Sequence, residues 1–242
     1  MSFDFQYAYL VGVLLFLPFW LACLWYRKDL RREILIVSLV FGIIAWSTEP
    51  LFLRDYWQPL YWKSLSFTWN GSLHQLGSLE DFLYGFFKGG IAAAIYEVIF
   101  GQHYTKRHIR THHWLLLLIP FFGIGIPLFI APIFLFGANS LYAALISCFF
   151  CILIYLFFRR DLFLDAFVSG ILVGLISFCV LLVFSVLFRG IFDVWWQLDS
   201  LSGHFIAGIP IEEFLESFAI GALLGPFYEF FAGLSFAHKS KH

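Results

Sequence analysis

Seven long apolar stretches dominate this sequence and decide what it can fold into. They cover approximately residues 7–26, 34–53, 79–100, 114–136, 141–158, 162–188 and 209–233. Each is close to the roughly 20 residues that an α-helix needs to cross the hydrocarbon core of a bilayer. The sequence lacks the polar–apolar alternation of a membrane β-barrel, so we expect seven transmembrane helices.

The composition supports a membrane environment. Apolar residues make up 61% of the 242 residues and charged residues 13%, against about 45–50% and about 25% in soluble domains. A soluble protein of this size could not cover so much apolar surface, which excludes a soluble enzyme, a disordered chain and a nucleic-acid-binding protein. We predict a single all-α domain over residues 1–242, in the cytoplasmic (inner) membrane and in contact with lipids. A homo-oligomer is left open.

Lysine and arginine predict the orientation. Eleven of them lie in the loops after stretches one, three, five and seven, whereas three lie in the loops on the other side. Because basic loops stay in the cytoplasm, we expect the N-terminus outside and the C-terminus in the cytoplasm. Termini on opposite sides of the membrane require an odd number of spans, and the seven stretches satisfy this requirement.

The chain also matches itself when it is shifted by 132 residues. The best stretch pairs residues 79–101 with 211–233, where eight of 23 positions are identical and composition alone would give roughly two. We therefore predict two parallel three-helix repeats, residues 7–101 and 141–233, related by an axis along the membrane normal. A linker helix over residues 114–136 would join them.

Two acidic pairs begin equivalent helices of the two repeats. Glu80 and Asp81 open the third stretch, and Glu212 and Glu213 open the seventh. Acids at a helix N-terminus commonly cap free N–H groups, and capping alone is one interpretation. The repetition of the pair, and the cost of placing charge in a membrane, favour a functional site instead. We predict these four acids as catalytic, with a surrounding shell of Glu216, Lys88, His74, His204, Phe82, Phe214 and Tyr84.

Other polar residues carry weaker predictions. Lys88 lies roughly 10 Å deeper than Asp81 on the same helix face, and needs a carboxylate partner, either Asp81 or Glu216. Glu97 and Glu229 each follow a tyrosine near the cytoplasmic surface, which is typical of a solvated charge beside an interfacial ring. The tryptophans of the outer loops, including Trp195 and Trp196, are expected at the lipid headgroups. No metal or other cofactor is predicted.

Adjacent carboxyls in apolar surroundings suit acid catalysis on an apolar substrate. Mutual repulsion keeps one of the two protonated, and such an acid can protonate an alkene. The ionised neighbour and the faces of aromatic rings can stabilise the resulting carbocation. We therefore expect an apolar isoprenoid or lipid substrate that enters from the bilayer.

The acid pairs also carry a family resemblance. Residues 208–215, Gly-Ile-Pro-Ile-Glu-Glu-Phe-Leu, resemble the P-x-E-E-x-x-F motif of the integral-membrane lycopene cyclase domain, the small carotenoid cyclase type of archaea, fungi and some bacteria. That family repeats the motif once per half, and residues 78–83, Ser-Leu-Glu-Asp-Phe-Leu, are similar to a first copy. The resemblance implies cyclisation of the linear ends of lycopene to β-ionone rings, a proton-initiated isomerisation. It also implies that Glu80, Asp81, Glu212 and Glu213 are the essential acids.

The chain departs from the family pattern at several positions. Ser78 stands in place of the proline of the first motif, Lys88 is unusual, and residues 84–85 and 216–217 replace aromatics. These departures indicate a divergent member of the family. We therefore expect the chain to share the fold of the family more closely than its substrate.

Two other functions stay open. One is an isoprenoid or lipid carrier, or a small transporter, that uses the interface between the repeats as its cavity. The other is a divergent glutamate-type intramembrane protease, since residues 210–213 resemble the start of its E-E-x-x-x-R motif. In this chain Ser217 stands at the arginine position.

Overall fold

The computed structural model describes residues 5–61, 66–69, 72–75, 77–101, 104–106, 114–232 and 234–236. For residues 66–69, 72–75, 104–106, 114–122, 231–232 and 234–236 the description is limited to the backbone. The α-helices in these residues are α1 (Ala8–Leu14), α2 (Leu17–Tyr26), α3 (Arg31–Phe52), α4 (Leu79–Ala92), α5 (Ile95–Phe100), α6 (Trp114–Phe136), α7 (Ser140–Phe158), α8 (Phe163–Leu187), α9 (Ile191–Trp195), α10 (Ile211–Leu224) and α11 (Phe227–Ala232).

Short elements connect these helices. The 3₁₀ turns are η1 (Phe5–Tyr7), η2 (Lys28–Leu30), η3 (Arg160–Leu162) and η4 (Leu198–Ser200). Three antiparallel strand pairs lie in the connections: β1 (Ser66–Trp69) with β2 (Ser72–Gln75), β3 (Tyr104–Lys106) with β6 (Leu234–Phe236), and β4 (Phe205–Ile206) with β5 (Ile209–Pro210). The prediction of an all-helical bundle is therefore confirmed, with strands limited to short connections.

Five helical segments in the described residues are long and apolar enough to cross a membrane. They are Phe5–Tyr26, Lys28–Phe52, Leu79–Phe100, Ser140–Phe158 and Arg160–Leu187. The remaining two apolar stretches of the sequence are also helical, as α6 and as α10 followed by α11. These helices are the structure expected of an integral membrane protein.

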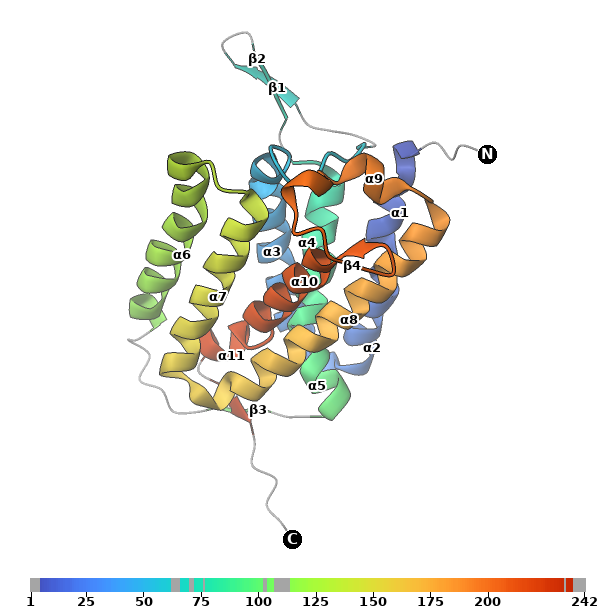
Figure 1. Ribbon diagram of the computed structural model, residues 1–242. Helices are drawn as coiled ribbons and strands as arrows, with labels where there is room; N and C mark the ends of the chain where they lie inside the picture. Colours follow the sequence, from blue (N-terminus) through green and yellow to red (C-terminus); the bar gives the residue numbers. More distant parts are fainter. Residues whose placement is uncertain are drawn as a thin grey trace.

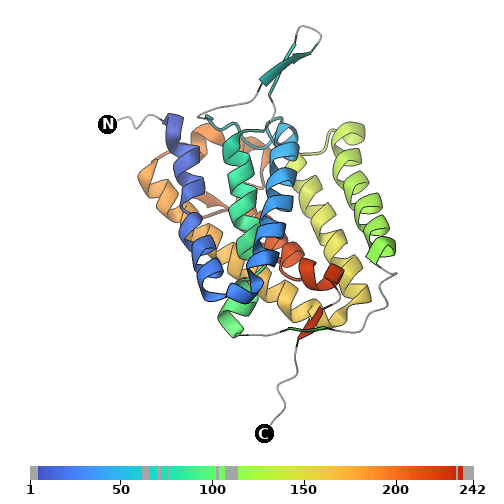
Figure 2. The same cartoon turned by 180° about the vertical axis from the view of Figure 1, so that it is seen from behind.

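The helices form a bundle with α4 and α10 at its centre (Figure 1). Helix α3 packs along α4, and α8 packs along α10. Helices α6 and α7 lie on one side of the bundle and α1 and α2 on the other, as the reverse view in Figure 2 also shows.

Glycines allow the two central helix pairs to approach closely. A Cβ atom at Gly42 would lie 2.9 Å from the Phe82 ring, and one at Gly174 would lie 2.8 Å from the Phe214 ring. Small residues at such contacts let helix backbones pack directly against each other. Both residues of the first contact lie 132 positions before those of the second, so α3–α4 and α8–α10 pack in the same way. Phe82 and Phe214, which we predicted near the substrate, are helix-packing residues in this arrangement.

Two helical stretches break before they reach the far end of the bundle. The first breaks at residues 93–94, between α4 and α5, and the second at residues 225–226, between α10 and α11. Pro226 explains the second break, because proline has no N–H to continue the helical ladder. Each break redirects the short helix that follows it, and with it Glu97 or Glu229.

The segment that follows α8 folds over one end of the bundle, whereas the β1–β2 hairpin projects away from it (Figure 1). Trp195 and Trp196 are buried, which makes the interfacial prediction for these two residues wrong. Their loop pairs with the loop after α3: the Gln58 amide donates to the Trp195 carbonyl at 2.6 Å, and the Gln197 amide donates to the Tyr56 carbonyl at 2.8 Å. These backbone bonds fix one loop against the other above α4 and α10.

Candidate functional site

A cavity of about 560 Å³ lies inside the bundle, and α4 and α10 both contribute to its wall. This volume falls within the roughly 300–1,000 Å³ of small-molecule sites. Its wall is mostly aliphatic and aromatic, and four carboxyl side chains border it: Glu49, Asp81, Glu213 and Glu216. An acidic site in apolar surroundings is therefore present, and its members come from both halves of the chain.

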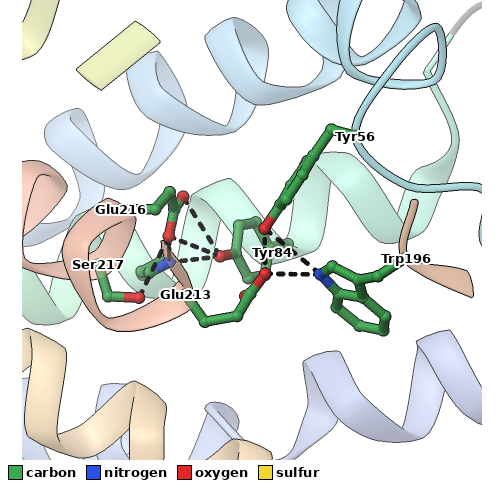
Figure 3. A network of polar contacts seen from close by, with 7 residues as sticks. Tyr56, Tyr84, Trp196, Glu213, Glu216 and Ser217 are labelled. Carbon is green, nitrogen blue, oxygen red and sulfur yellow. Dashed lines mark hydrogen bonds and ion pairs between the residues drawn. The ribbon is translucent and has the colours of Figure 1, made fainter. Parts of the chain in front are cut away.

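Glu213 is held by two side-chain donors from the loops. The Tyr56 hydroxyl and the Trp196 indole N–H both donate to Oε1, the latter at 2.6 Å (Figure 3). No hydrogen bond from the described residues reaches Oε2. The N-cap of helix α10 is Pro210, which has no N–H that the Glu213 carboxylate could cap. Capping therefore does not explain Glu213.

Tyr56 is suited to a permanent donor role. It is buried in the loop after α3, and burial together with the negative charge of Glu213 raises the pKa of its hydroxyl well above the ordinary value. The hydroxyl stays protonated as a result, and holds Oε1 of Glu213 as an acceptor.

Asp81 occupies the equivalent position in α4 but is bonded differently. Its Oδ2 accepts from the Ser78 amide at 2.5 Å, while the Ser78 hydroxyl accepts from the Asp81 amide at 3.2 Å. This is a capping box at the start of α4. Its Oδ1 accepts from the Tyr9 hydroxyl at 2.8 Å. The capping interpretation therefore holds for Asp81, which borders the cavity as well.

The first acid of each pair does not line the cavity. Glu80 is fully buried, and its side chain lies outside the cavity wall. Glu212 accepts from the Tyr142 hydroxyl at 3.0 Å and from the Ser202 amide at 2.7 Å. Each predicted pair is therefore split, with its second acid, Asp81 or Glu213, directed to the cavity.

Of the two predicted histidines, the structure describes the side chain of His204 only. His204 is exposed and lies outside the cavity wall. The side chain of His74 falls outside the described part of the structure.

Lys88 and Glu216 connect α4 to α10. The Lys88 ammonium lies 2.5 Å from Glu216 Oε2 and also donates to the Tyr84 hydroxyl. The Tyr84 hydroxyl donates to Glu216 Oε2 at 3.3 Å, and the Ser217 hydroxyl donates to the same oxygen at 3.1 Å. Lys88 is 1% exposed. Of the two partners we proposed from sequence, the structure thus places Glu216 against Lys88, not Asp81.

Several residues of the site were missed from sequence. Glu49 is buried in α3 and accepts from the Tyr61 hydroxyl at 3.0 Å. An acid inside an apolar stretch is a signal that the sequence carries, and Glu49 was not among the predicted residues. Tyr9 carried no comparable signal. The loops that hold Tyr56 and Trp196 were notable only as tryptophan-rich loops, because the contacts of both residues depend on how the loops fold onto the helices.

Glu97 and Glu229 were predicted to be solvated charges, and this is wrong. Their exposures are 1% and 0%. The helix breaks before α5 and α11 turn both side chains into the protein instead of letting them reach the surface.

A comparison with known protein families gives a match in the second half of the chain. Residues 139–231 match the lycopene cyclase family model. The match includes α10 with Glu212, Glu213 and Glu216, and it confirms the resemblance found in the motif at residues 208–215. No curated protein and no solved structure matches the chain.

Proposed function

We propose that this membrane protein is a lycopene-cyclase-like enzyme, which cyclises the ends of a linear carotenoid or related isoprenoid. The observation that carries the proposal is Glu213, an acid that does not cap its helix and borders an apolar cavity. Two donors occupy its Oε1, so the proton of the neutral acid lies on Oε2. The match over residues 139–231 supports the same activity.

The proposed reaction starts with proton transfer from Glu213 to the terminal double bond of the polyene, which forms a tertiary carbocation. A neighbouring double bond attacks this centre and closes the ring. Loss of a ring proton to the Glu213 carboxylate restores the acid, so the product is an isomer of the substrate. Asp81 and the rings of Tyr56 and Trp57, which border the same cavity, would stabilise the cationic intermediate. No cofactor is required.

One side of the cavity wall supports entry of the substrate into the cavity from the bilayer. Val40 and Ile44 of α3 and Ile126 and Ile130 of α6 border the cavity and are also exposed. Exposed aliphatic side chains at a cavity wall suit lateral entry of an apolar molecule from surrounding lipid tails.

We also propose the seven-span topology, with repeats over residues 7–101 and 141–233 and a linker at 114–136. Equivalent contacts support it: Arg27 donates to the Glu97 carbonyl, and 132 positions later Arg159 donates to the Glu229 carbonyl. An odd number of crossings is supported by the positions of η1 and β6 at opposite ends of the bundle (Figure 1). With the basic loops inside, the N-terminus would be outside the cytoplasmic membrane.

Expression in lycopene-accumulating cells tests the activity. We expect extracted pigment to contain a cyclised product with the mass of lycopene and a different chromatographic retention. Unchanged lycopene in cells whose membranes contain the protein would overturn the proposal.

A carrier function is the second candidate, because a large apolar cavity with a lateral apolar wall also suits binding alone. In that case the purified protein would retain lycopene without converting it. The protease alternative has less support, since no histidine lines the cavity among the residues that the structure describes.

Replacement of Tyr56 by phenylalanine tests how Glu213 is positioned. Tyr56→Phe removes one of the two hydrogen bonds to Oε1 of the neutral acid, worth about 1 kcal/mol for an uncharged acceptor, and should lower product yield about fivefold. Tyr142→Phe is the matched control, because its hydroxyl bonds Glu212, outside the cavity. Equal yields from the two variants, measured by chromatography of cell extracts, would contradict this role for Tyr56.

A further inference from the structure

A second group of carboxyls lies away from the cavity, near the breaks before α5 and α11. It consists of Glu33 of α3, Glu97 of α5, Asp165 of α8 and Glu229 of α11, with exposures of 3%, 1%, 0% and 0%. None of these four described side chains borders the cavity. Glu33 and Asp165 are 132 positions apart, as are Glu97 and Glu229, so each half of the chain contributes one equivalent pair. We call these four residues the four-acid cluster.

Three members of the cluster bring carboxylate oxygens close to one another. One carboxylate oxygen from each of Glu97, Asp165 and Glu229 can be chosen so that all three lie within 4.8 Å of one another. Calcium ligands lie about 2.3–2.6 Å from the ion and magnesium ligands about 2.0–2.1 Å. Oxygens around one such ion are therefore separated by no more than about 5 Å, which fits the cluster.

Unsatisfied oxygens provide a second observation. Glu33 Oε1 and Asp165 Oδ2 are buried and have no hydrogen-bond partner in the described part of the chain. Glu33 interacts electrostatically with Glu97 and Asp165 and forms a side-chain hydrogen bond with Glu229, so its side chain is directed into the cluster. Buried acceptors without partners are costly and require an explanation.

The nearby arginines already have other partners. Arg27 pairs with Asp29 at 2.8 Å and donates to the Glu97 backbone carbonyl at 2.7 Å. Arg159 pairs with Asp161 at 2.7 Å and donates to the Glu229 carbonyl at 3.5 Å. In these contacts the guanidinium groups bind exposed acids and backbone carbonyls at the border of the cluster, and Arg27 also interacts electrostatically with Glu33.

We propose that the four-acid cluster binds one divalent cation of the hard, oxygen-preferring class, Mg²⁺, Mn²⁺ or Ca²⁺. A set of carboxylates without sulfur or imidazole selects this class. The ion joins α3, α5, α8 and α11, and so holds the two halves of the chain together at the end opposite the paired outer loops. It takes no part in the chemistry of the cavity.

Manganese binding to the purified full-length protein tests this proposal. After removal of metals with a chelator, titration with Mn²⁺ followed by electron paramagnetic resonance should show about one bound ion per chain, displaced by Mg²⁺ or Ca²⁺. The double variant Glu97→Gln/Glu229→Gln should bind at least about tenfold more weakly, since loss of even an outer-sphere partner costs roughly 10- to 100-fold.

The control is Asp193→Asn/Asp199→Asn, which removes two exposed carboxylates outside the cluster and should bind Mn²⁺ like the wild type. If the Glu97/Glu229 variant does not purify, Glu33→Gln replaces it with the same expectation. The absence of saturable binding to the wild type at about 1 mM Mn²⁺, as expected if the acids only share protons, would overturn the proposal. So would equal binding by wild type and cluster variants. Since the readout is metal binding, a negative cyclase assay leaves this test intact.

Discussion

Glu213→Gln is expected to abolish the cyclised product in lycopene-accumulating cells. Glutamine keeps the shape of the side chain and an oxygen that can accept from Tyr56 and Trp196, but it has no acidic proton to transfer. General acids contribute typically about 10²–10⁴-fold to a rate, so the yield should fall at least about 100-fold. The measurement is chromatography of extracted pigments at matched levels of the protein in the membrane.

Two control variants make this result specific. Asp193→Asn removes an exposed acid outside the cavity and should retain the wild-type yield. Glu212→Gln should lose much less product than Glu213→Gln, because the Glu212 carboxyl bonds Tyr142 and Ser202 away from the cavity. A wild-type yield from Glu213→Gln would show that the proton comes from another group, and a larger loss from Glu212→Gln would reverse the assignment within the pair.

Lys88→Met is expected to destabilise the protein by about 3 kcal/mol, the lower end of the usual cost of removing one partner of a buried ion pair, because Lys88 is buried but the Glu216 side chain keeps 20% of its surface exposed. The substitution leaves Glu216 without the ammonium group that lies 2.5 Å from its carboxylate. Adding Glu216→Gln removes the unpaired charge, so the double variant should recover a large part of the loss. Unfolding in detergent, followed by circular dichroism, measures both effects.

Lys28→Met provides the comparison, since Lys28 is exposed and surface substitutions usually change stability by less than about 0.5 kcal/mol. Additive losses from Lys88→Met and Glu216→Gln would mean that the pair contributes no coupling energy. The observed contact would then have no energetic importance.

The distribution of apolar residues along the sequence was enough to predict the helices. The stretch at 114–136 coincides with α6, and the stretch at 79–100 coincides with α4 and α5 except for the break at 93–94. The depth of Lys88 in its helix was enough to limit its possible carboxylate partners to Asp81 and Glu216. These predictions succeed because helix length and helix periodicity depend only on local sequence.

The tertiary structure alone decided which acids face the cavity. Neighbouring residues on an α-helix point about 100° apart, but the sequence does not say which of Glu212 and Glu213 faces the cavity. The packing of α10 selects Glu213. The donors Tyr56 and Trp196 come from loops that are 140 residues apart in the sequence and meet through backbone pairing. Glu97 and Glu229 are buried because the helix breaks turn them inward. The sequence by itself thus determined the apolar helices and the acidic and aromatic residues available for chemistry. Long-range packing determined which of these side chains share a site, because the contacts of the site join residues that are far apart in the sequence.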